Sequence, residues 1–175
     1  MIIWLNGAFG AGKTTVADAL CRRLPTARRV DPEWIGGLLR RVRKVPTGDY
    51  QDLVAWRRWT VRLVGLAAHA DRPVVVPMSL LQPTHRTEIL DGLRDRGRTV
   101  RQLVLQVPEP ALRARIDADA ADVAARAWRQ RQVSRALTGL AGLADREPDT
   151  IEVTNDGRTP EQVAAEIIDR LGVSG

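Results

Sequence analysis

Apolar residues form short continuous runs at several places along the chain. The run Ile2 to Leu5 ends at Asn6-Gly7, and three consecutive valines stand at 74–76. Short runs of this kind, rich in β-branched residues, are typical of strands buried on both faces of a parallel sheet. We therefore predict strands over residues 2–5 and 74–76, a short strand ending near Val30, and further strands over residues 100–107 and 151–154.

Between these runs the apolar spacing changes to the period of amphipathic helices. After Lys13, apolar residues recur every three or four positions until Pro25, and Asp31-Pro32 and Thr159-Pro160 carry helix-start signals. The pattern predicts helices over residues 13–24, 33–43, 53–70, 83–96, 110–137 and 160–171. Strands that alternate with helices indicate an α/β protein, in which a parallel sheet is covered by helices on both faces.

Composition fits one domain over residues 1–175, with 44% hydrophobic and 27% charged residues. The net charge of +6 comes almost wholly from arginine, since only Lys13 and Lys44 are lysines. Solvated helix faces explain most of these arginines, and we do not expect a nucleic-acid partner.

The sequence indicates no disulfide, metal site or membrane span. Cys21 is the only cysteine, His69 and His85 lack metal-ligand spacing, and no apolar run reaches the length of a membrane span. We expect a cytoplasmic monomer or homodimer.

The segment between the first strand and the first helix carries the strongest motif. Gly7 to Thr14 fits the G-x-x-x-x-G-K-[ST] phosphate-binding loop, or P-loop. Glycines let backbone amides turn toward phosphates, and the next helix presents the positive end of its dipole. We predict that ATP contacts Gly7, Ala8, Phe9, Gly10, Ala11, Gly12, Lys13, Thr14 and Thr15, with Lys13 at the β- and γ-phosphates and the Thr14 hydroxyl on Mg²⁺.

The rest of the chain narrows the class of nucleotide-binding protein. No guanine-reading N-K-x-D motif occurs, which argues against a GTPase, and motor ATPases usually run longer. A small-molecule kinase remains the leading class.

Asp31 is the candidate for the acceptor side of such a site. It follows the second strand at the carboxyl edge of the sheet, where open α/β folds bind ligands. A carboxylate there would accept the proton of an acceptor hydroxyl or hold a magnesium-bound water. Asp31 is equally placed to be only the N-cap of the next helix. After the valines at 74–76 no acid occurs until Glu88, so we expect magnesium to be held without the usual aspartate.

Arginines cluster late in the predicted helix over residues 110–137. We predict a lid around residues 118–142 that closes arginines over the transferring phosphoryl group, with Arg129 and Arg131 as first choices before Arg126 and Arg135. A solvated helix face is the alternative. Tyr50, Trp56 and Trp59 are candidates for stacking against an acceptor, or for the core.

Residues 1–14, Asp31-Pro32-Glu33 and Pro77-Met78 together resemble the tunicamycin-resistance family of P-loop proteins. More distantly, the layout is similar to chloramphenicol phosphotransferase, shikimate kinase and nucleoside monophosphate kinases. The resemblance implies a five-stranded sheet in the order 2-3-1-4-5, a role for Asp31 at the acceptor hydroxyl, lid arginines near ATP, and an adenine loop that includes Asn155 and Arg158. It also implies a nucleoside antibiotic such as tunicamycin as ligand.

Three functions follow as hypotheses. The first is an ATP- and Mg²⁺-dependent phosphotransferase acting on a hydroxyl of a small molecule, such as a nucleoside antibiotic. The second is an ATP-binding protein that sequesters the antibiotic without chemistry, which the missing acid after the valines suggests. The third, which the net charge of +6 suggests, is a nucleic-acid 5′-kinase.

Overall fold

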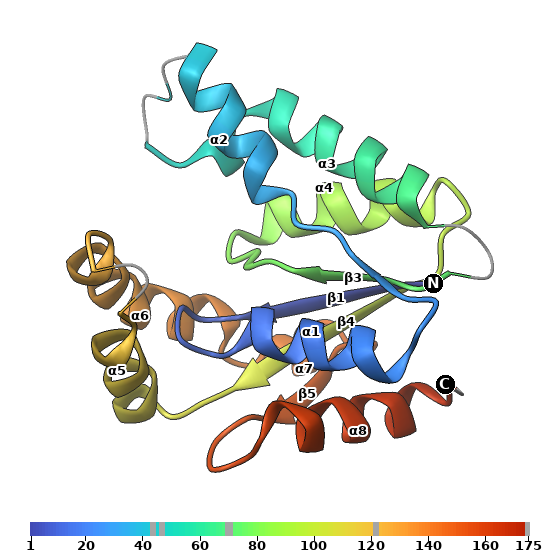
Figure 1. Cartoon of the computed structure of the whole chain (residues 1–175). Helices are drawn as coiled ribbons and strands as arrows, with labels where there is room; N and C mark the ends of the chain where they lie inside the picture. Colours follow the sequence, from blue (N-terminus) through green and yellow to red (C-terminus); the bar gives the residue numbers. More distant parts are fainter. Residues whose placement is uncertain (43–44, 46–47, 69–71, 121–122, 174–175) are drawn as a thin grey trace.

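The parallel sheet of the protein has β1 at its centre (Figure 1). The computed structural model describes residues 1–42, 45, 48–68, 72–120 and 123–173. Within them, five parallel strands lie in the order β2-β3-β1-β4-β5, which confirms the predicted fold class and strand order. The strands are β1 (Ile2–Gly7), β2 (Arg28–Arg29), β3 (Val74–Pro77), β4 (Val100–Gln106) and β5 (Ile151–Thr154).

Helices cover both faces of this sheet, as predicted (Figure 1). One face carries α1 (Lys13–Arg23) and α8 (Pro160–Leu171), and the other carries α2 (Glu33–Val42), α3 (Val54–Ala67) and α4 (Pro83–Arg94). At the edge where the strands end lie α5 (Glu109–Ala118) and α6 (Arg126–Leu140), and the short α7 (Leu143–Arg146) precedes β5. None of the described helices has the length and apolar character needed to cross a lipid bilayer.

The alternation of side chains along β1 divides the core in two. Ile3 and Leu5 pack with α1 and α8 on one face, whereas Ile2 and Trp4 pack with α3 and α4 on the other. The Trp4 indole also donates a hydrogen bond to the Met78 carbonyl at 2.9 Å. A residue pattern that is apolar at every position thus results from a strand with no solvent-facing side.

The prediction of one helix over residues 110–137 was wrong, because two helices occupy this region. α5 ends at Ala118, and Asp119 is extended, with φ −71° and ψ 101°. The Asp119 carboxylate accepts a hydrogen bond from Arg129 at 2.7 Å. Gln130 donates one to the Arg113 carbonyl at 3.0 Å, which ties α6 to α5. Side-chain hydrogen bonds of this kind compete with helix continuation.

One other difference concerns the segment before α3. A turn of 3-10 helix, η1 (Tyr50–Asp52), precedes α3, where the sequence indicated a loop and then the start of a helix. The Asp49 carboxylate caps η1 by accepting from the Gln51 amide at 3.0 Å. His69, Lys44 and the predicted ends of the helices over 33–43 and 53–70 lie outside the described residues.

Candidate active site

The loop between β1 and α1 has a backbone that requires glycine. Gly10 and Gly12 have φ of 79° and 82°, a region that residues with a Cβ rarely adopt. A Cβ on Gly12 would lie 2.7 Å from the Asn155 amide nitrogen. Helix α1 then begins at Lys13 without a side-chain cap. Its first amides therefore have no intrahelical partner, an arrangement suited to holding an anion.

The Lys13 ammonium lies over this loop. Its Nζ donates hydrogen bonds to the carbonyls of Gly7 and Ala8, at 3.1 and 2.9 Å, and lies 5.6 Å from the centre of the Phe9 ring. Burial lowers the pKa of Lys13 to about 8; the charge of Glu33 opposes this shift and that of Arg129 adds to it. A cation with so little solvent around it attracts a nearby phosphate strongly, because water screens the charges only weakly there.

The two threonines after Lys13 have different surroundings. Thr14 is exposed in the first turn of α1. Thr15 is also exposed, but its hydroxyl donates to the Gly12 carbonyl at 2.9 Å. Thr14 is thus the hydroxyl with room for an added ligand.

Side chains at the ends of neighbouring strands hold the loop in place. The Asn6 side-chain oxygen Oδ1 accepts from the backbone amides of Gly7 and Leu80, at 2.9 and 3.0 Å, and the Ser79 hydroxyl donates to the Gly7 carbonyl at 2.7 Å. From the other side, the Asn155 amide donates to the Ala11 carbonyl at 2.8 Å. Buried hydrogen bonds from three strand ends therefore fix the loop before any ligand binds.

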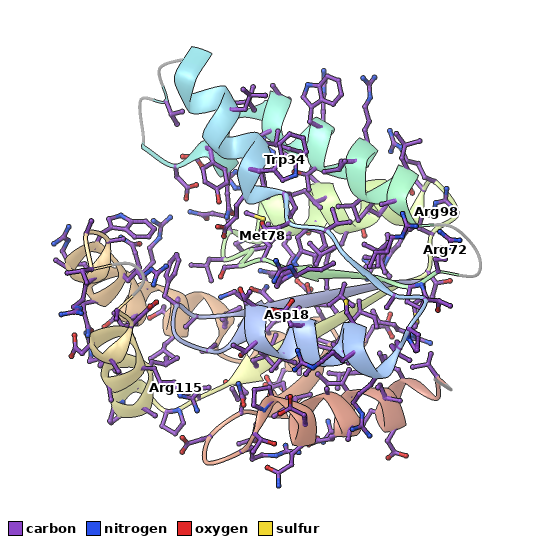
Figure 2. The ribbon with its side chains drawn as sticks, in the orientation of Figure 1. Asp18, Trp34, Arg72, Met78, Arg98 and Arg115 are labelled. Carbon is purple, nitrogen blue, oxygen red and sulfur yellow. The ribbon has the colours of Figure 1, made fainter. Side chains whose placement is uncertain are left out.

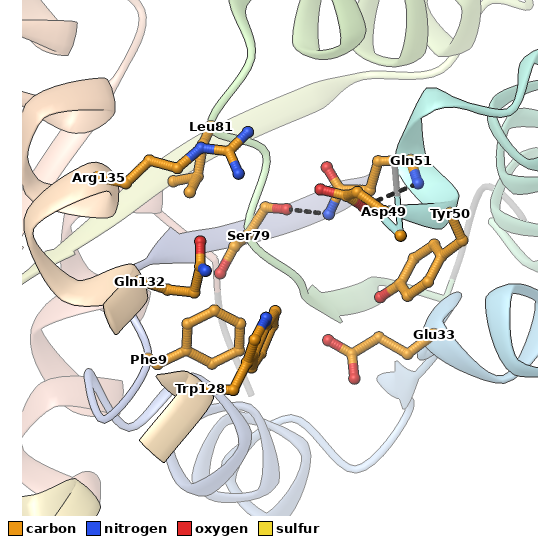
Figure 3. Close-up of a pocket in the computed structure, with 11 residues that line it drawn as sticks. Phe9, Glu33, Asp49, Tyr50, Gln51, Ser79, Leu81, Trp128, Gln132 and Arg135 are labelled. Carbon is orange, nitrogen blue, oxygen red and sulfur yellow. Dashed lines mark hydrogen bonds between the residues drawn. The ribbon is translucent and has the colours of Figure 1, made fainter. Parts of the chain in front are cut away.

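A pocket of about 210 Å³ opens beside the loop (Figure 3). Its wall comes from the P-loop, the start of α2, the η1 segment, the end of β3 and one face of α6. The lining residues are Phe9, Glu33, Gly48, Asp49, Tyr50, Gln51, Ser79, Leu81, Trp128, Gln132 and Arg135. Aromatic rings flank it on two sides, with Phe9 and Trp128 together and Tyr50 across from them. Such a mixture of rings, amides and charges is typical of a site for a small polar molecule.

Two carboxylates near the start of α2 lie in different surroundings. Asp31 Oδ1 accepts a hydrogen bond from the Glu33 amide at 2.9 Å, so this side chain caps the helix. Glu33 lines the pocket and is close enough to Lys13 to raise its pKa. The sequence analysis did not select Glu33. The available signal was its position two residues after Asp31, at the carboxyl edge of the sheet.

Helix α6 presents one face to the pocket, at the spacing of a helical stripe. Trp128, Gln132 and Arg135 line the wall, and the Trp128 ring meets the Phe9 ring edge-on at 5.0 Å between centroids. Arg129 pairs with Asp119 at 2.7 Å and is near enough to Lys13 to lower its pKa. Arg131 is exposed and is not among the lining residues.

The predicted adenine loop is held by its own contacts. Arg158 donates to the Thr154 carbonyl at 2.9 Å and pairs with Glu166, while the Asn155 side chain holds the P-loop as described above. Arg115 of α5, labelled in Figure 2, donates to the Asn155 carbonyl at 2.7 Å and to the Gly10 carbonyl at 3.4 Å. Sequence reasoning missed Arg115, which lies among other arginines without a distinguishing motif.

Of the aromatic candidates, only Tyr50 faces the pocket. Trp56 is fully buried in the core, where its indole donates to the Pro32 carbonyl at 3.1 Å. Trp59 is 53% exposed, with the Arg62 guanidinium 5.6 Å from its ring centre.

Comparison with known proteins decides the family. A family profile described as an AAA domain matches residues 2–142. The chain belongs to this AAA domain family. No match was found among curated proteins.

Solved structures similar to this AAA domain include kinases and a resistance protein. The tunicamycin resistance protein of Deinococcus radiodurans is 29% identical, with a TM-score of 0.77, and the match covers 99% of this chain and 96% of that one. The Mycobacterium tuberculosis APS kinase CysC, solved with AMPPNP and APS, is 18% identical with a TM-score of 0.62, covering 98% and 97%. The Bacteroides thetaiotaomicron shikimate kinase is 18% identical with a TM-score of 0.63, covering 99% of each chain. The resemblance to tunicamycin-resistance proteins and to P-loop small-molecule kinases is thereby confirmed.

The described part of the AAA domain has few side chains placed to ligate a metal ion. It contains no group of three or more His, Cys, Asp or Glu side chains placed to hold one. Ser79 stands near the end of β3, where an acid was expected and not found in the sequence. Any magnesium here would depend mainly on phosphate oxygens and water, as is common for this ion.

Proposed function

We propose that the protein transfers the γ-phosphoryl group of ATP to a hydroxyl of a small molecule. The observation that carries this proposal is that the Lys13 side chain and the pocket adjoin: Phe9 contacts the lysine and lines the pocket. A phosphate chain on the loop would therefore end beside a molecule in the pocket. Phosphoryl transfer needs such positioning more than it needs strong acids or bases.

The residues around this junction supply the parts of the reaction. Lys13 holds the transferring phosphate, and the amides of the loop, residues 7–15, hold the rest of the chain. Glu33, at the pocket wall, accepts the proton of the acceptor hydroxyl, with Asp31 as the alternative base. Arg129 and Arg135 of α6 offset negative charge, and Arg131 is a further candidate. Magnesium, with Thr14 as its protein ligand and Asp31 acting through water, would neutralise the phosphate oxygens when bound.

A nucleoside antibiotic such as tunicamycin is the first acceptor to test. The similarity to the Deinococcus radiodurans protein supports this choice. So do the rings on two sides of the pocket, since flat heterocycles stack on aromatic side chains. The acidic and amide groups between them suit hydroxyl donors.

Mass spectrometry tests the reaction directly. The protein is incubated with ATP, Mg²⁺ and tunicamycin or a panel of nucleosides and sugars, and a gain of one phosphoryl group is expected on at least one compound. Lys13→Ala should lower turnover by about 10²-fold or more, whereas Arg23→Ala, an exposed change at the far end of α1, should not. ATP hydrolysis without a phosphorylated acceptor would contradict the proposal.

Sequestration without chemistry is the second candidate, and the absence of an acidic metal cluster among the described residues favours it. In that case the protein binds the antibiotic and holds it. The double variant Lys13→Ala, Asp31→Asn would then still confer resistance on cells. Loss of resistance, with antibiotic binding retained in calorimetry, would support phosphorylation instead.

A further inference from the structure

The position of Tyr50 in the pocket wall depends on a glycine in α2. A Cβ on Gly36 would lie 2.6 Å from Cγ and Cδ2 of the Tyr50 ring and 2.8 Å from Cδ1. These are ring atoms near the backbone, so a small rotation of the side chain would not clear them. The ring therefore lies directly on the helix backbone, in space that only a residue without a side chain leaves open.

The Tyr50 ring also has no room to move toward the core. On its inner side it packs on Trp56, at 5.3 Å between ring centroids and 56° between planes. Trp56 is fully buried, and close-packed cores resist displacement of such a side chain. Added volume at Gly36 would thus shift Tyr50 and the segment that carries it, and with them this part of the pocket wall.

The segment that carries Tyr50 forms a large part of that wall. Four of the lining residues are consecutive, Gly48 to Gln51 (Figure 3). The segment is held from the opposite side, where Gln51 donates to the Ser79 carbonyl at 2.9 Å and Arg57 donates to the Gln51 carbonyl at 2.7 Å. It is therefore fixed between α2 and the end of β3, and a change at Gly36 alters the shape of the pocket.

We propose that Gly36 and Tyr50 together determine which acceptors fit this pocket. The inference rests on the proposed function, because it assigns the pocket to the acceptor. Tyr50 provides the flat surface across from Phe9 and Trp128, which selects acceptors that carry a ring. Gly36 fixes how far that surface stands from the opposite wall and so sets the largest ring-bearing acceptor admitted.

Adjacent glycines offer a matched pair for the test. Gly36→Ala adds the methyl group that meets Tyr50, whereas Gly37→Ala adds the same group one position later, where nothing lies within 4 Å. We expect Gly36→Ala to raise the Kd of tunicamycin, measured by calorimetry, at least about tenfold, the scale of one methylene in a binding pocket. The Kd of ATP should stay within about twofold in both variants, and Gly37→Ala should match the wild type.

A double variant separates this role from a general loss of structure. Gly36→Ala, Tyr50→Ala removes the ring that the new methyl group meets, so it should bind bulky acceptors better than Gly36→Ala alone. If Gly36→Ala does not fold, Tyr50→Ala alone should bring the affinities for large and small ring-bearing nucleosides closer together. Equal tunicamycin affinities in Gly36→Ala and Gly37→Ala would overturn the inference. So would a loss of ATP affinity in Gly36→Ala as large as its loss of tunicamycin affinity. If the wild-type protein binds tunicamycin without phosphorylating it, this result contradicts the proposed transferase activity but not the inference about Gly36 and Tyr50.

Discussion

At the start of α2, one carboxylate caps the helix and another lines the pocket. Asp31 accepts the Glu33 amide and so stabilises the helix, while Glu33 lines the pocket beside Lys13. The geometry therefore favours Glu33 as the base, and the role of Asp31 in catalysis stays a prediction. The sequence analysis selected only Asp31, although Glu33 follows it by two residues at the same strand end.

Conservative variants of the two residues distinguish their roles. Glu33→Gln should lower kcat by about 10²-fold or more, the usual contribution of a general base, with the Kd of ATP nearly unchanged. Asp31→Ala should lower the free energy of unfolding by about 1 kcal/mol through the lost cap, and Asp31→Asn should keep the cap. Steady-state kinetics and urea unfolding measure these effects. An inactive Asp31→Asn beside an active Glu33→Gln would move the base to Asp31.

The pKa of Lys13 gives a second test at the residue scale. Burial lowers this pKa to about 8, so at pH 9 the free protein holds most of Lys13 uncharged. Phosphates favour the ammonium and should restore its pKa, and ATP binding at pH 9 should then take up close to one proton. At pH 7 the uptake by Lys13 should be small, because the lysine is already charged.

Calorimetry in buffers of different ionisation enthalpy counts these protons. Lys13→Arg is the control, since its guanidinium stays charged at both pH values and should take up none. Equal proton uptake by the wild type and Lys13→Arg at pH 9 would show that another group titrates.

At the scale of elements, the ends of three strands fix the P-loop through buried amides. Asn155 after β5 is 4% exposed, and its side chain holds the Ala11 carbonyl. Asn155→Ala would leave that carbonyl without its partner and should lower the free energy of unfolding by about 1–3 kcal/mol. ATP affinity should fall as well, because the loop loses one of its supports. Urea unfolding and calorimetry test both effects, and Thr154→Ala, an exposed neighbour, should change neither.

The sequence predicted elements better than the contacts between them. The apolar run of β1, the glycine loop and the period of α1 are local signals, and all three lie where they were expected. The break between α5 and α6 was missed because it depends on hydrogen bonds from Arg129 and Gln130 across to the preceding helix. In the same way, Glu33 lines the pocket only because residues far away in the sequence form the rest of its wall. Such contacts produce no periodic pattern in the amino-acid sequence.

At the scale of the whole molecule, arginine joins elements that are distant in sequence. Arg22 of α1 pairs with Glu161 of α8 at 2.7 Å, and Arg57 of α3 pairs with Glu88 of α4. Arg86 of α4 reaches Glu147 beyond α7 at 2.7 Å. A guanidinium suits this use because it donates several hydrogen bonds in fixed directions. These pairs give a physical reason for the use of arginine rather than lysine at such positions.

The Arg86–Glu147 pair should contribute to global stability in a pH-dependent way. Arg86 is 1% exposed, so removing its partner leaves a buried charge. Burial raises the pKa of Glu147, but hydrogen bonds from Arg86 and Gln102 and the Arg86 charge outweigh it, and the pKa lies below its ordinary value of 4.5. A group with a lowered pKa stabilises the fold above that ordinary value, and the stabilisation is lost as pH falls through the lowered one.

Glu147→Gln should therefore lower the free energy of unfolding by about 2–3 kcal/mol at pH 7, somewhat less than for fully buried pairs because the Glu147 side chain is 35% exposed. The gap between variant and wild type in urea unfolding should be smaller at an acidic pH, below the lowered pKa of Glu147, than at pH 7, because the wild-type carboxylate is then protonated. Glu161→Gln is the matched control: it breaks the exposed pair with Arg22 and should change the free energy of unfolding at pH 7 much less than Glu147→Gln does. An equal gap at both pH values would mean that Glu147 acts through packing rather than charge.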